Sequence, residues 1–265
     1  MTTNLATPTP DPLACALPEP PDPARFPDAR YFDTSWPIRT GDVDASSRLR
    51  FDGVARYLQD IGNDNLEAID ALDTHPYWIV RRTVIDVVRP TTGTERVALR
   101  RWCSGFSTRW ADMRVQITSE SGALLETSGF WINISGETGM PTRMSDGFLA
   151  GLTRSTDEHR LKWKQWLPKT PPADASVRHF PLRRTDIDPF DHVNNAAYWH
   201  AVEELLAEPE SAHLATVPHR AVVEYLSPVT SSDELVLRTV HTDSSLTTWF
   251  MVGDTVRAVA AVTTR

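Results

Sequence analysis

Several features that mark particular protein classes are missing from this 265-residue sequence. It has only two cysteines, Cys15 and Cys103, which are too few for a disulfide framework or a thiolate zinc cage and which indicate a reducing compartment. No apolar run approaches the roughly 18 residues of a membrane-spanning helix. The net charge is -8, so a nucleic-acid-binding role is disfavoured.

Motifs of several enzyme classes are also absent. The sequence has no GxSxG elbow of a serine hydrolase, no HExxH pair among its eight histidines, and no GxGxxG or Walker loop. These absences disfavour metal catalysis and serine-hydrolase chemistry. Residues 1–16 contain no basic region followed by a continuous apolar core, so we expect no secretory signal and a cytoplasmic location.

Proline is concentrated near the N-terminus. Five prolines follow one another too closely for a helix or a central strand: Pro18, Pro20, Pro21, Pro23 and Pro27. We expect residues 1–28 to form a disordered tail.

What the sequence does contain is an internal repeat. Residues 41–49 (GDVDASSRL) and 185–193 (TDIDPFDHV) share Asp-x-Asp, followed four residues later by Arg48 or His192. A helical pattern follows each stretch. Its apolar positions are Phe51, Val54, Leu58, Ile61 and Leu66 in the first copy and Tyr198, Val202, Leu205 and Leu206 in the second.

The similarity continues downstream. Residues 84–90 match 222–228, and residues 95–100 match 233–238. The offset is 144 residues at the aspartates (188 − 44) and 138 at the prolines (228 − 90), a difference that a loop tolerates. Strand-like runs with turns at Gly122 and Gly253 close the copies. Each copy is therefore predicted to be one long helix on an antiparallel sheet, an α+β arrangement.

The segment Asp188-Pro-Phe-Asp-His-Val-Asn-Asn-Ala-Ala-Tyr198 resembles the hot-dog thioesterase superfamily, and the tandem arrangement resembles the acyl-acyl-carrier-protein thioesterases. The resemblance covers about residues 31–265. It implies a tandem (double) hot-dog fold, hydrolysis of a fatty acyl thioester, and no metal or cofactor. The expected organisation is an N-terminal, acyl-chain-binding hot-dog domain at 29–150, a connector at 151–172 with a helix at 158–167, and a catalytic C-terminal domain at 173–265.

The sequence departs from this family at three positions. The family's loop has Asp-x-Asn-x-His, whereas Phe190 stands at the Asn position, and Pro228 and Val229 stand where Glu and Cys are expected. The pair Asp188-Pro189 is closer to single-domain hot-dog acyl-CoA thioesterases. An acyl-CoA thioesterase, a non-catalytic acyl-binding hot-dog protein and a hydratase or dehydratase are the alternatives.

Thioester hydrolysis needs a nucleophile or base and donors for the oxyanion. Asp188, at a helix start, is the first candidate for the carboxylate, although a helix or turn cap is its alternative role. His192 is the candidate for orienting water or protonating the thiolate. The expected accessory residues, each with a structural alternative, are Asn194, Asn195 and Glu203.

The first copy keeps Asp44 but has Arg48 in place of a histidine, which predicts that it has lost catalysis. Its apolar strand residues are candidates for an acyl pocket, with ordinary core packing as the alternative. We name Trp78, Val80 and Trp131 as substrate-binding residues.

The expected partner is an acyl carrier protein or a coenzyme A thioester, both of which carry phosphate. Two groups of basic residues are candidates for receiving it, with plain solubility as the alternative. They are Arg154, Arg160, Lys162, Lys164 and Lys169 in the connector and Arg178, Arg183 and Arg184 before the loop. We expect the two copies to form a pseudo-dimer within the chain, as a monomer or a homodimer.

Overall fold

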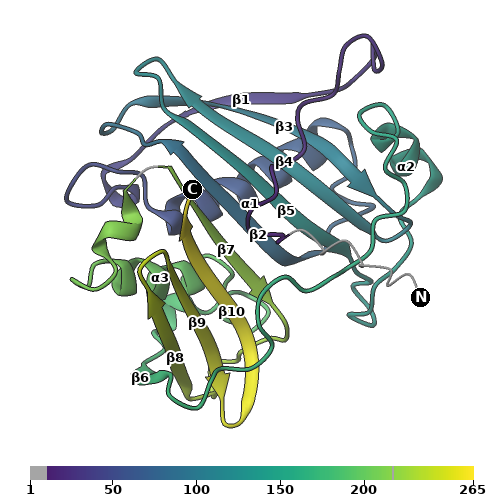
Figure 1. Cartoon of the computed structure of the whole chain (residues 1–265). Coiled ribbons are helices and arrows are strands. Elements are labelled where there is room, and N and C mark those ends of the chain that lie inside the picture. The colour runs from purple at the N-terminus through teal and green to yellow at the C-terminus, as the bar shows by residue number, and fades with distance from the viewer. Residues whose placement is uncertain (1–10, 217) are drawn as a thin grey trace, which may run out of the picture.

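The computed structural model describes residues 11–216 and 218–265, which form an α+β fold around one antiparallel sheet of ten strands (Figure 1). The strand order is β1-β3-β4-β5-β2-β7-β10-β9-β8-β6. The strands are β1 (Phe32–Pro37), β2 (Trp78–Arg89), β3 (Arg96–Phe106), β4 (Trp110–Ser119), β5 (Leu124–Asn133), β6 (Ser176–Phe180), β7 (His219–Tyr225), β8 (Leu235–Thr242), β9 (Ser245–Val252) and β10 (Thr255–Thr264).

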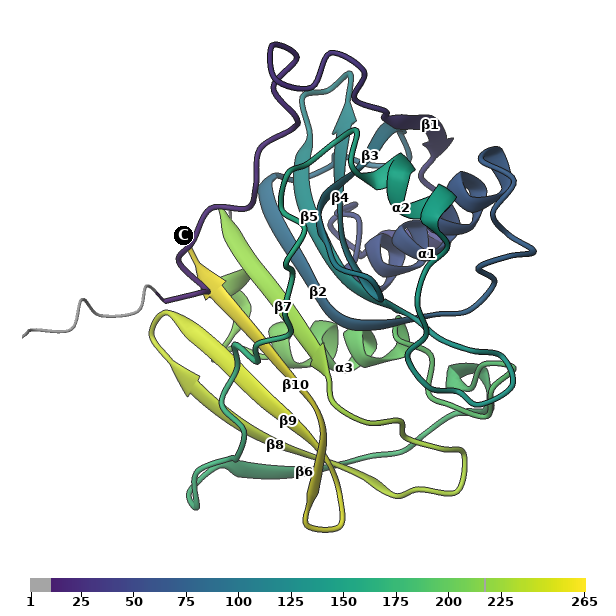
Figure 2. The ribbon, with the colours of Figure 1, turned by 90° about the vertical axis from the view of Figure 1, so that its right-hand side faces the viewer.

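The helices lie mainly on one face of this sheet (Figure 2). They are α1 (Phe51–Ala68), α2 (Asp146–Leu152) and α3 (Ala197–Leu206), with short 3-10 turns η1 (Thr40–Asp42), η2 (Arg184–Asp186) and η3 (Ala212–Ala215). Helices α1 and α3 contact each other and share one hydrophobic core with the sheet. Among the described residues, no helix has the length and apolar character needed to cross a membrane.

The second half of the sheet repeats the strand order of the first. Strands β1-β3-β4-β5-β2 occupy the same relative places as β6-β8-β9-β10-β7, and each half has one long helix before its second strand. The halves join where β2 pairs with β7, with Ile85 opposite Ala221. The predicted turns are present, and Gly122 and Gly253 adopt the positive φ angles that favour glycine there.

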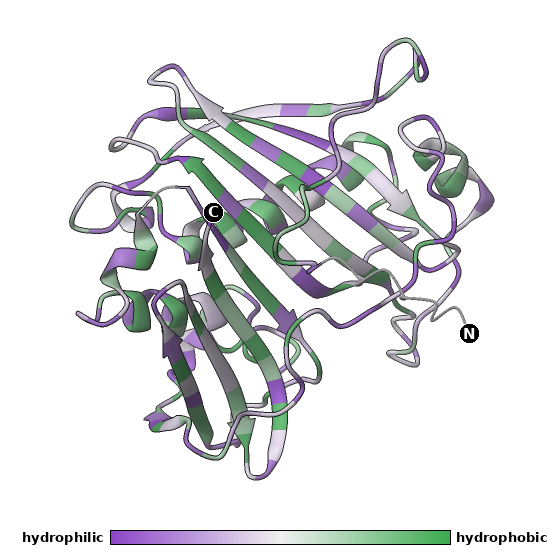
Figure 3. Ribbon diagram, viewed as in Figure 1, coloured by the Kyte–Doolittle hydropathy of each residue, from purple (hydrophilic) through white to green (hydrophobic). Residues whose placement is uncertain are grey.

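The helices form where the apolar spacing predicts them. All five predicted core positions of α1 and all four of α3 are buried. Each such side chain contributes about 1.5–3 kcal/mol by leaving water. Hydrophilic and hydrophobic residues alternate along many of the strands, as expected for a sheet with one face on a core (Figure 3).

The N-terminal segment differs from expectation. Residues 1–10 lie outside the described part of the chain, but residues 11–28 are not disordered and follow a defined path beside the sheet. The buried guanidinium of Arg220 donates to the carbonyls of Leu13 (3.0 Å) and Cys15 (2.7 Å), and Arg114 donates to that of Pro18. Because the prolines prevent regular helix or sheet pairing in this segment, its carbonyl groups can accept hydrogen bonds from side chains. Two buried arginines therefore hold a segment whose composition predicts disorder.

The connector also differs, because residues 158–167 form no helix. Its backbone is bound by the sheet instead. The buried carboxylate of Glu224 accepts hydrogen bonds from the N–H groups of Trp166 (2.9 Å) and Leu167 (2.9 Å), and Arg82 stacks on the Trp166 ring at 3.6 Å. These tertiary contacts outweigh the local helical pattern. The helix in this region is α2, which runs across the expected domain boundary at residue 150.

Candidate active site

Two equivalent loops precede α1 and α3, and their backbones fold alike. In the first loop, Oδ1 of Asp44 accepts hydrogen bonds from the N–H groups of Ser46 and Arg48, both at 2.9 Å. In the second, Oδ1 of Asp188 accepts from Phe190 (2.9 Å) and His192 (3.2 Å). Both aspartates therefore act as turn caps. The matched positions Ser47 and Asp191 both have positive φ, at 65° and 58°.

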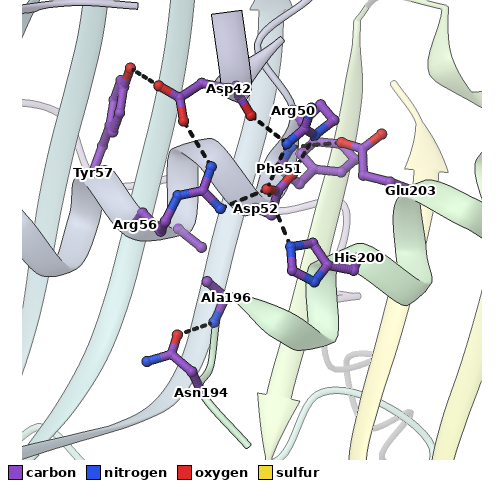
Figure 4. Close-up of polar contacts among 12 residues, drawn as sticks. Asp42, Arg50, Phe51, Asp52, Arg56, Tyr57, Asn194, Ala196, His200 and Glu203 are labelled. Carbon is purple, nitrogen blue, oxygen red and sulfur yellow. Dashed lines mark hydrogen bonds and ion pairs between the residues drawn. The ribbon is translucent and has the colours of Figure 1, made fainter. Parts of the chain in front are cut away.

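In the first loop, Arg48 forms ion pairs with two carboxylates. Arg48 donates from Nε to Oδ2 of Asp44 (3.0 Å) and from Nη2 to Glu203 of α3 (2.5 Å). Glu203 also accepts from the N–H of Phe51 (2.6 Å), at the start of α1 (Figure 4). The side chains of Arg48 and Glu203 are only 16% and 12% exposed. The structure thus places Glu203 at the first loop, away from Asp188, in an ion pair that joins the two halves.

The second loop has no equivalent of these ion pairs among the described residues. His192 stands where Arg48 stands in the first loop, and neither its ring nor Oδ2 of Asp188 has a hydrogen-bond partner among residues 11–216 and 218–265. Both residues are partly exposed. One carboxylate oxygen is therefore fixed by the turn, while the other and the imidazole remain available to a substrate.

Asn194 joins this loop to the first half of the chain. Its amide oxygen accepts from the N–H of Ala196 (2.9 Å; Figure 4), just before α3 begins. It also exchanges two hydrogen bonds of 3.3 Å with the side-chain amide of Gln59 on α1. Gln59 lies 144 residues before Glu203 (203 − 59), which is the repeat offset, so the two residues occupy equivalent positions in α1 and α3. Gln59 contacts the second loop and Glu203 the first, so each helix contacts the loop of the other half. Sequence reasoning missed Gln59, although the repeat offset identifies it.

Asn195 turns inward at the start of α3. Its backbone carbonyl accepts from the hydroxyl of Tyr225 (3.1 Å), which in turn accepts from the indole of Trp199. Its side-chain oxygen is buried and has no hydrogen-bond partner among the described residues. A buried acceptor without a partner is costly, so this oxygen is suited to a donor supplied by a ligand or water.

A charged cluster supports the loops from between the helices. The buried carboxylate of Asp52 binds Arg50 (2.8 Å) and Arg56 (2.6 Å) and lies 3.4 Å from Nε2 of His200 (Figure 4). Burial raises the pKa of Asp52, but the hydrogen bonds from these three residues outweigh burial and hold that pKa well below its usual range. Nδ1 of His200 accepts from Arg183, which in turn binds the buried Asp186 at the second loop.

A mainly apolar cavity of about 90 Å³ lies beside α1 in the first half. Of the three residues predicted to bind substrate, Trp78 and Trp131 line it, whereas Val80 is buried in β2 and does not. Asp188, His192 and Asn194 do not line it; the second loop is linked to it through Gln59, which lines the cavity and contacts Asn194. The other lining residues are Gly62, Asn63, Asn65, Leu66, Ile69, Arg101, Ala111, Met113, Phe148 and Leu152.

A second, more open hollow of about 360 Å³ adjoins the loop from another side. Tyr77 lines it and makes an edge-to-face contact with Phe190 at 6.0 Å between ring centres. Phe190, which replaces the family's Asn, is 62% exposed. An aromatic side chain at this position therefore widens the apolar surface at the loop instead of supplying a hydrogen-bonding amide.

The predicted basic residues all lie on the surface. Arg178 pairs with Glu208 and Arg183 with Asp186, so these two are engaged within the protein. The remaining six form no ion pair with any residue that the structure describes. They are Arg154, Arg160, Lys162, Lys164, Lys169 and Arg184. No group of three or more metal-binding side chains occurs among the described residues.

Comparison with known proteins agrees with this architecture. Residues 29–152 match the acyl-ACP thioesterase N-terminal domain family and residues 169–260 match the C-terminal domain family. A Mycobacterium tuberculosis protein described only as uncharacterized is 45% identical over 229 residues, covering 86% of this chain and 90% of that protein.

Solved structures share the fold. A putative oleoyl thioesterase from Lactobacillus plantarum superposes with a TM-score of 0.72 at 18% identity, over 89% of this chain and 95% of that one. The 12:0-ACP thioesterase from Umbellularia californica superposes with a TM-score of 0.70 at 18% identity, over 89% and 97%. With both domain families matched in order along one chain, this protein belongs to the acyl-ACP thioesterase family.

Proposed function

We propose that this protein is a thiolester hydrolase that releases a free fatty acid from an acyl thioester, with an acyl carrier protein as the thiol carrier. The observation that carries the proposal is the different state of the two equivalent loops. Arg48 and Glu203 fill the first loop, whereas Asp188 and His192 in the second have no partner for their functional atoms among the described residues. The family to which the chain belongs supports the reaction class.

The reaction adds water across the carbon–sulfur bond and gives a carboxylate and a thiol. In our proposal, Oδ2 of Asp188, which the turn leaves unbound, accepts the proton of the attacking water; α3 begins only at Ala197, so Asp188 is not at the helix start as the sequence suggested. The oxyanion also needs a hydrogen-bond donor, and the N–H groups of Ala196 and Ala197 do not supply it because both are bound to Asn194. His192 donates a proton to the departing thiolate, and Asn194 and Asn195 hold the substrate.

The finer architecture is also a proposal. We infer that the chain is a tandem hot-dog in which residues 29–150 bind the acyl chain, 151–172 connect, and 173–265 carry the catalytic loop. The repeated strand order and the reciprocal contacts of Gln59 and Glu203 support a pseudo-dimer made by duplication. In this arrangement Glu203 has a structural role, because its partners belong to the first loop.

Thiol release from acyl carrier protein and from acyl-CoA thioesters of graded length tests the proposal. Asp188→Asn is a sharp variant because the amide oxygen still caps the turn and only the charge is lost. We expect turnover to fall by about tenfold or more, a barrier increase of about 1.4 kcal/mol. Asp44→Asn is the matched control and should leave turnover nearly intact. Equal losses in the two variants would remove the distinction on which the mechanism rests.

An acyl-CoA thioesterase is the second candidate. Phe190 in place of Asn, together with Pro228 and Val229, favours it, because these positions depart from the carrier-protein family's residue set. The same assay separates the candidates, since faster release from coenzyme A than from carrier protein at matched acyl length reverses our preference. Binding of acyl thioesters without any thiol release would instead identify a non-catalytic acyl-binding protein.

A further inference from the structure

An arginine faces the core where strand alternation calls for an apolar side chain. Along β3, Val97 and Leu99 are buried against the α1 side of the sheet. Side chains two residues apart share a face, so Arg101 points the same way. Its neighbour Arg100 points outward and pairs with Asp33 in solvent. A violation of the core pattern of this kind is typical of functional positions.

Arg101 lines the apolar cavity beside α1 and has little to neutralise it. Its guanidinium donates to the side-chain oxygen of Asn65, which lines the same cavity. No carboxylate among the described residues pairs with it, in contrast to Arg48, Arg56, Arg82, Arg114 and Arg220. Burial lowers the pKa of Arg101 to about 10, which still leaves it charged at neutral pH.

The position of Arg101 relates it to the loop. Gln59, which contacts Asn194, and Asn65 both line the cavity, and Asn65 is six residues farther along α1, a rise of about 9 Å. Helix α1 lies beside the first-half strands (Figure 2). An acyl group that passes Gln59 and extends along α1 would meet the guanidinium with its distal part.

The cation discriminates between acyl groups by the chemistry of that distal part. A saturated chain would pack methylene groups against a charge and remove its water without replacing the hydrogen bonds, which is unfavourable. A carboxylate at the far end would accept two parallel hydrogen bonds from the planar guanidinium, and one bond to Asn65 leaves donors available.

We propose that the acyl pocket of this protein is built for acyl thioesters whose far end carries a carboxylate, with Arg101 as the specificity-determining residue and Asn65 holding it in place. The inference rests on the proposed thioesterase function, whose substrate class it narrows.

Paired coenzyme A thioesters test it: hexanoyl against adipyl, octanoyl against suberyl, and decanoyl against sebacyl, with ω-hydroxyacyl thioesters of the same lengths as a third arm. For at least one length, kcat/KM should favour the carboxylate by about ten- to a hundredfold over the plain chain. Arg101→Met should abolish this preference. Arg101→Lys keeps the positive charge but loses the planar guanidinium that binds a carboxylate through two parallel hydrogen bonds, so it should retain part of the preference. Arg100→Met is the matched control and should leave the preference unchanged.

Plain chains preferred at every length, ω-hydroxyacyl chains used as well as carboxylated ones, or an unchanged ratio in Arg101→Met would each overturn the proposal. A purely structural role for Arg101 lowers turnover of both substrates alike and leaves the ratio unchanged.

A binding measurement separates this inference from the proposed function. Thermal stabilisation of the wild-type protein by adipate, suberate or sebacate, compared with the neutral α,ω-diols of the same lengths, needs no catalysis. Stronger stabilisation by the dicarboxylates supports the pocket assignment even if no thioester is cleaved, and equal stabilisation refutes it even if all thioesters are cleaved. It also tests the wild-type pocket should Arg101→Met fail to fold.

Discussion

Replacing Glu203 with glutamine separates a structural role of this residue from a catalytic one. Glu203 accepts from Arg48 (2.5 Å) and from the N–H of Phe51 (2.6 Å), and its side chain is 12% exposed. Removing one partner of a buried ion pair costs about 3–5 kcal/mol. In the variant, Arg48 still pairs with Asp44, and the glutamine amide oxygen at position 203 can still accept from the N–H group of Phe51. We therefore expect a smaller loss of unfolding free energy, about 2–3 kcal/mol.

For a chain of this length, such a loss lowers Tm by about 5–10 °C. Circular dichroism at increasing temperature measures it, and thiol release well below Tm measures turnover on the same preparation. We expect reduced Tm with turnover close to that of the wild type. Glu204→Gln is the matched control, since Glu204 is the adjacent, exposed helix residue and should alter neither quantity. A Glu203→Gln protein with unchanged Tm and turnover reduced about a hundredfold would refute this reasoning and make Glu203 catalytic.

Two further predictions concern the supports of the site. The pKa of Asp52 is depressed in the folded state, so its stabilising contribution is complete above the unfolded value of 3.8 and disappears as pH falls through the folded pKa. Urea unfolding should accordingly show a gap between wild type and Asp52→Asn that narrows as the pH falls below 3.8; a gap that stays constant below that pH contradicts the assignment. Glu224→Gln should loosen the connector, because Glu224 binds Arg82 (3.1 Å) and two connector N–H groups. Limited trypsin digestion followed by mass spectrometry should then show faster cleavage at the exposed Lys162 and Lys164, and wild-type cleavage rates would show that other contacts hold the segment.

The sequence predicts those parts of the fold that depend on local pattern. Apolar spacing at 3.6-residue intervals predicts both long helices and their buried residues, and Gly122 and Gly253 predict two hairpin turns, because these signals act within a few residues. The helix predicted in the connector is wrong for the opposite reason, because the connector's conformation depends on a distant residue. That residue is Glu224, which is 57 residues beyond Leu167 and whose carboxylate binds connector N–H groups that a helix would have used.

In the candidate site too, the features that depend on local pattern are predicted and those that depend on distant contacts are not. The loop around Asp188 is evident from its motif and from its repeat, but the residues that face it from the other half are not. Gln59 becomes meaningful only once the two helices are seen to cross, and Arg101 only once β3 is seen to face α1. Both were accessible to a closer reading: Gln59 through the 144-residue offset, and Arg101 through the alternation that begins at Val97. Neither pattern, however, states which neighbour the side chain meets.

The differences between the two loops form a consistent set. On the closed side the facing residues are Arg48 and Glu203, which neutralise each other; at the matched positions on the open side they are His192 and Gln59, which form no ion pair in the described residues. In a homodimer of identical units every substitution would appear at both loops, so an ion pair that strengthens one interface would also fill the other. Joining the units in one chain removes that constraint. One loop can then hold the halves together through charge, while the other leaves its carboxylate and imidazole unpaired within the described residues, as our proposed thioesterase mechanism requires.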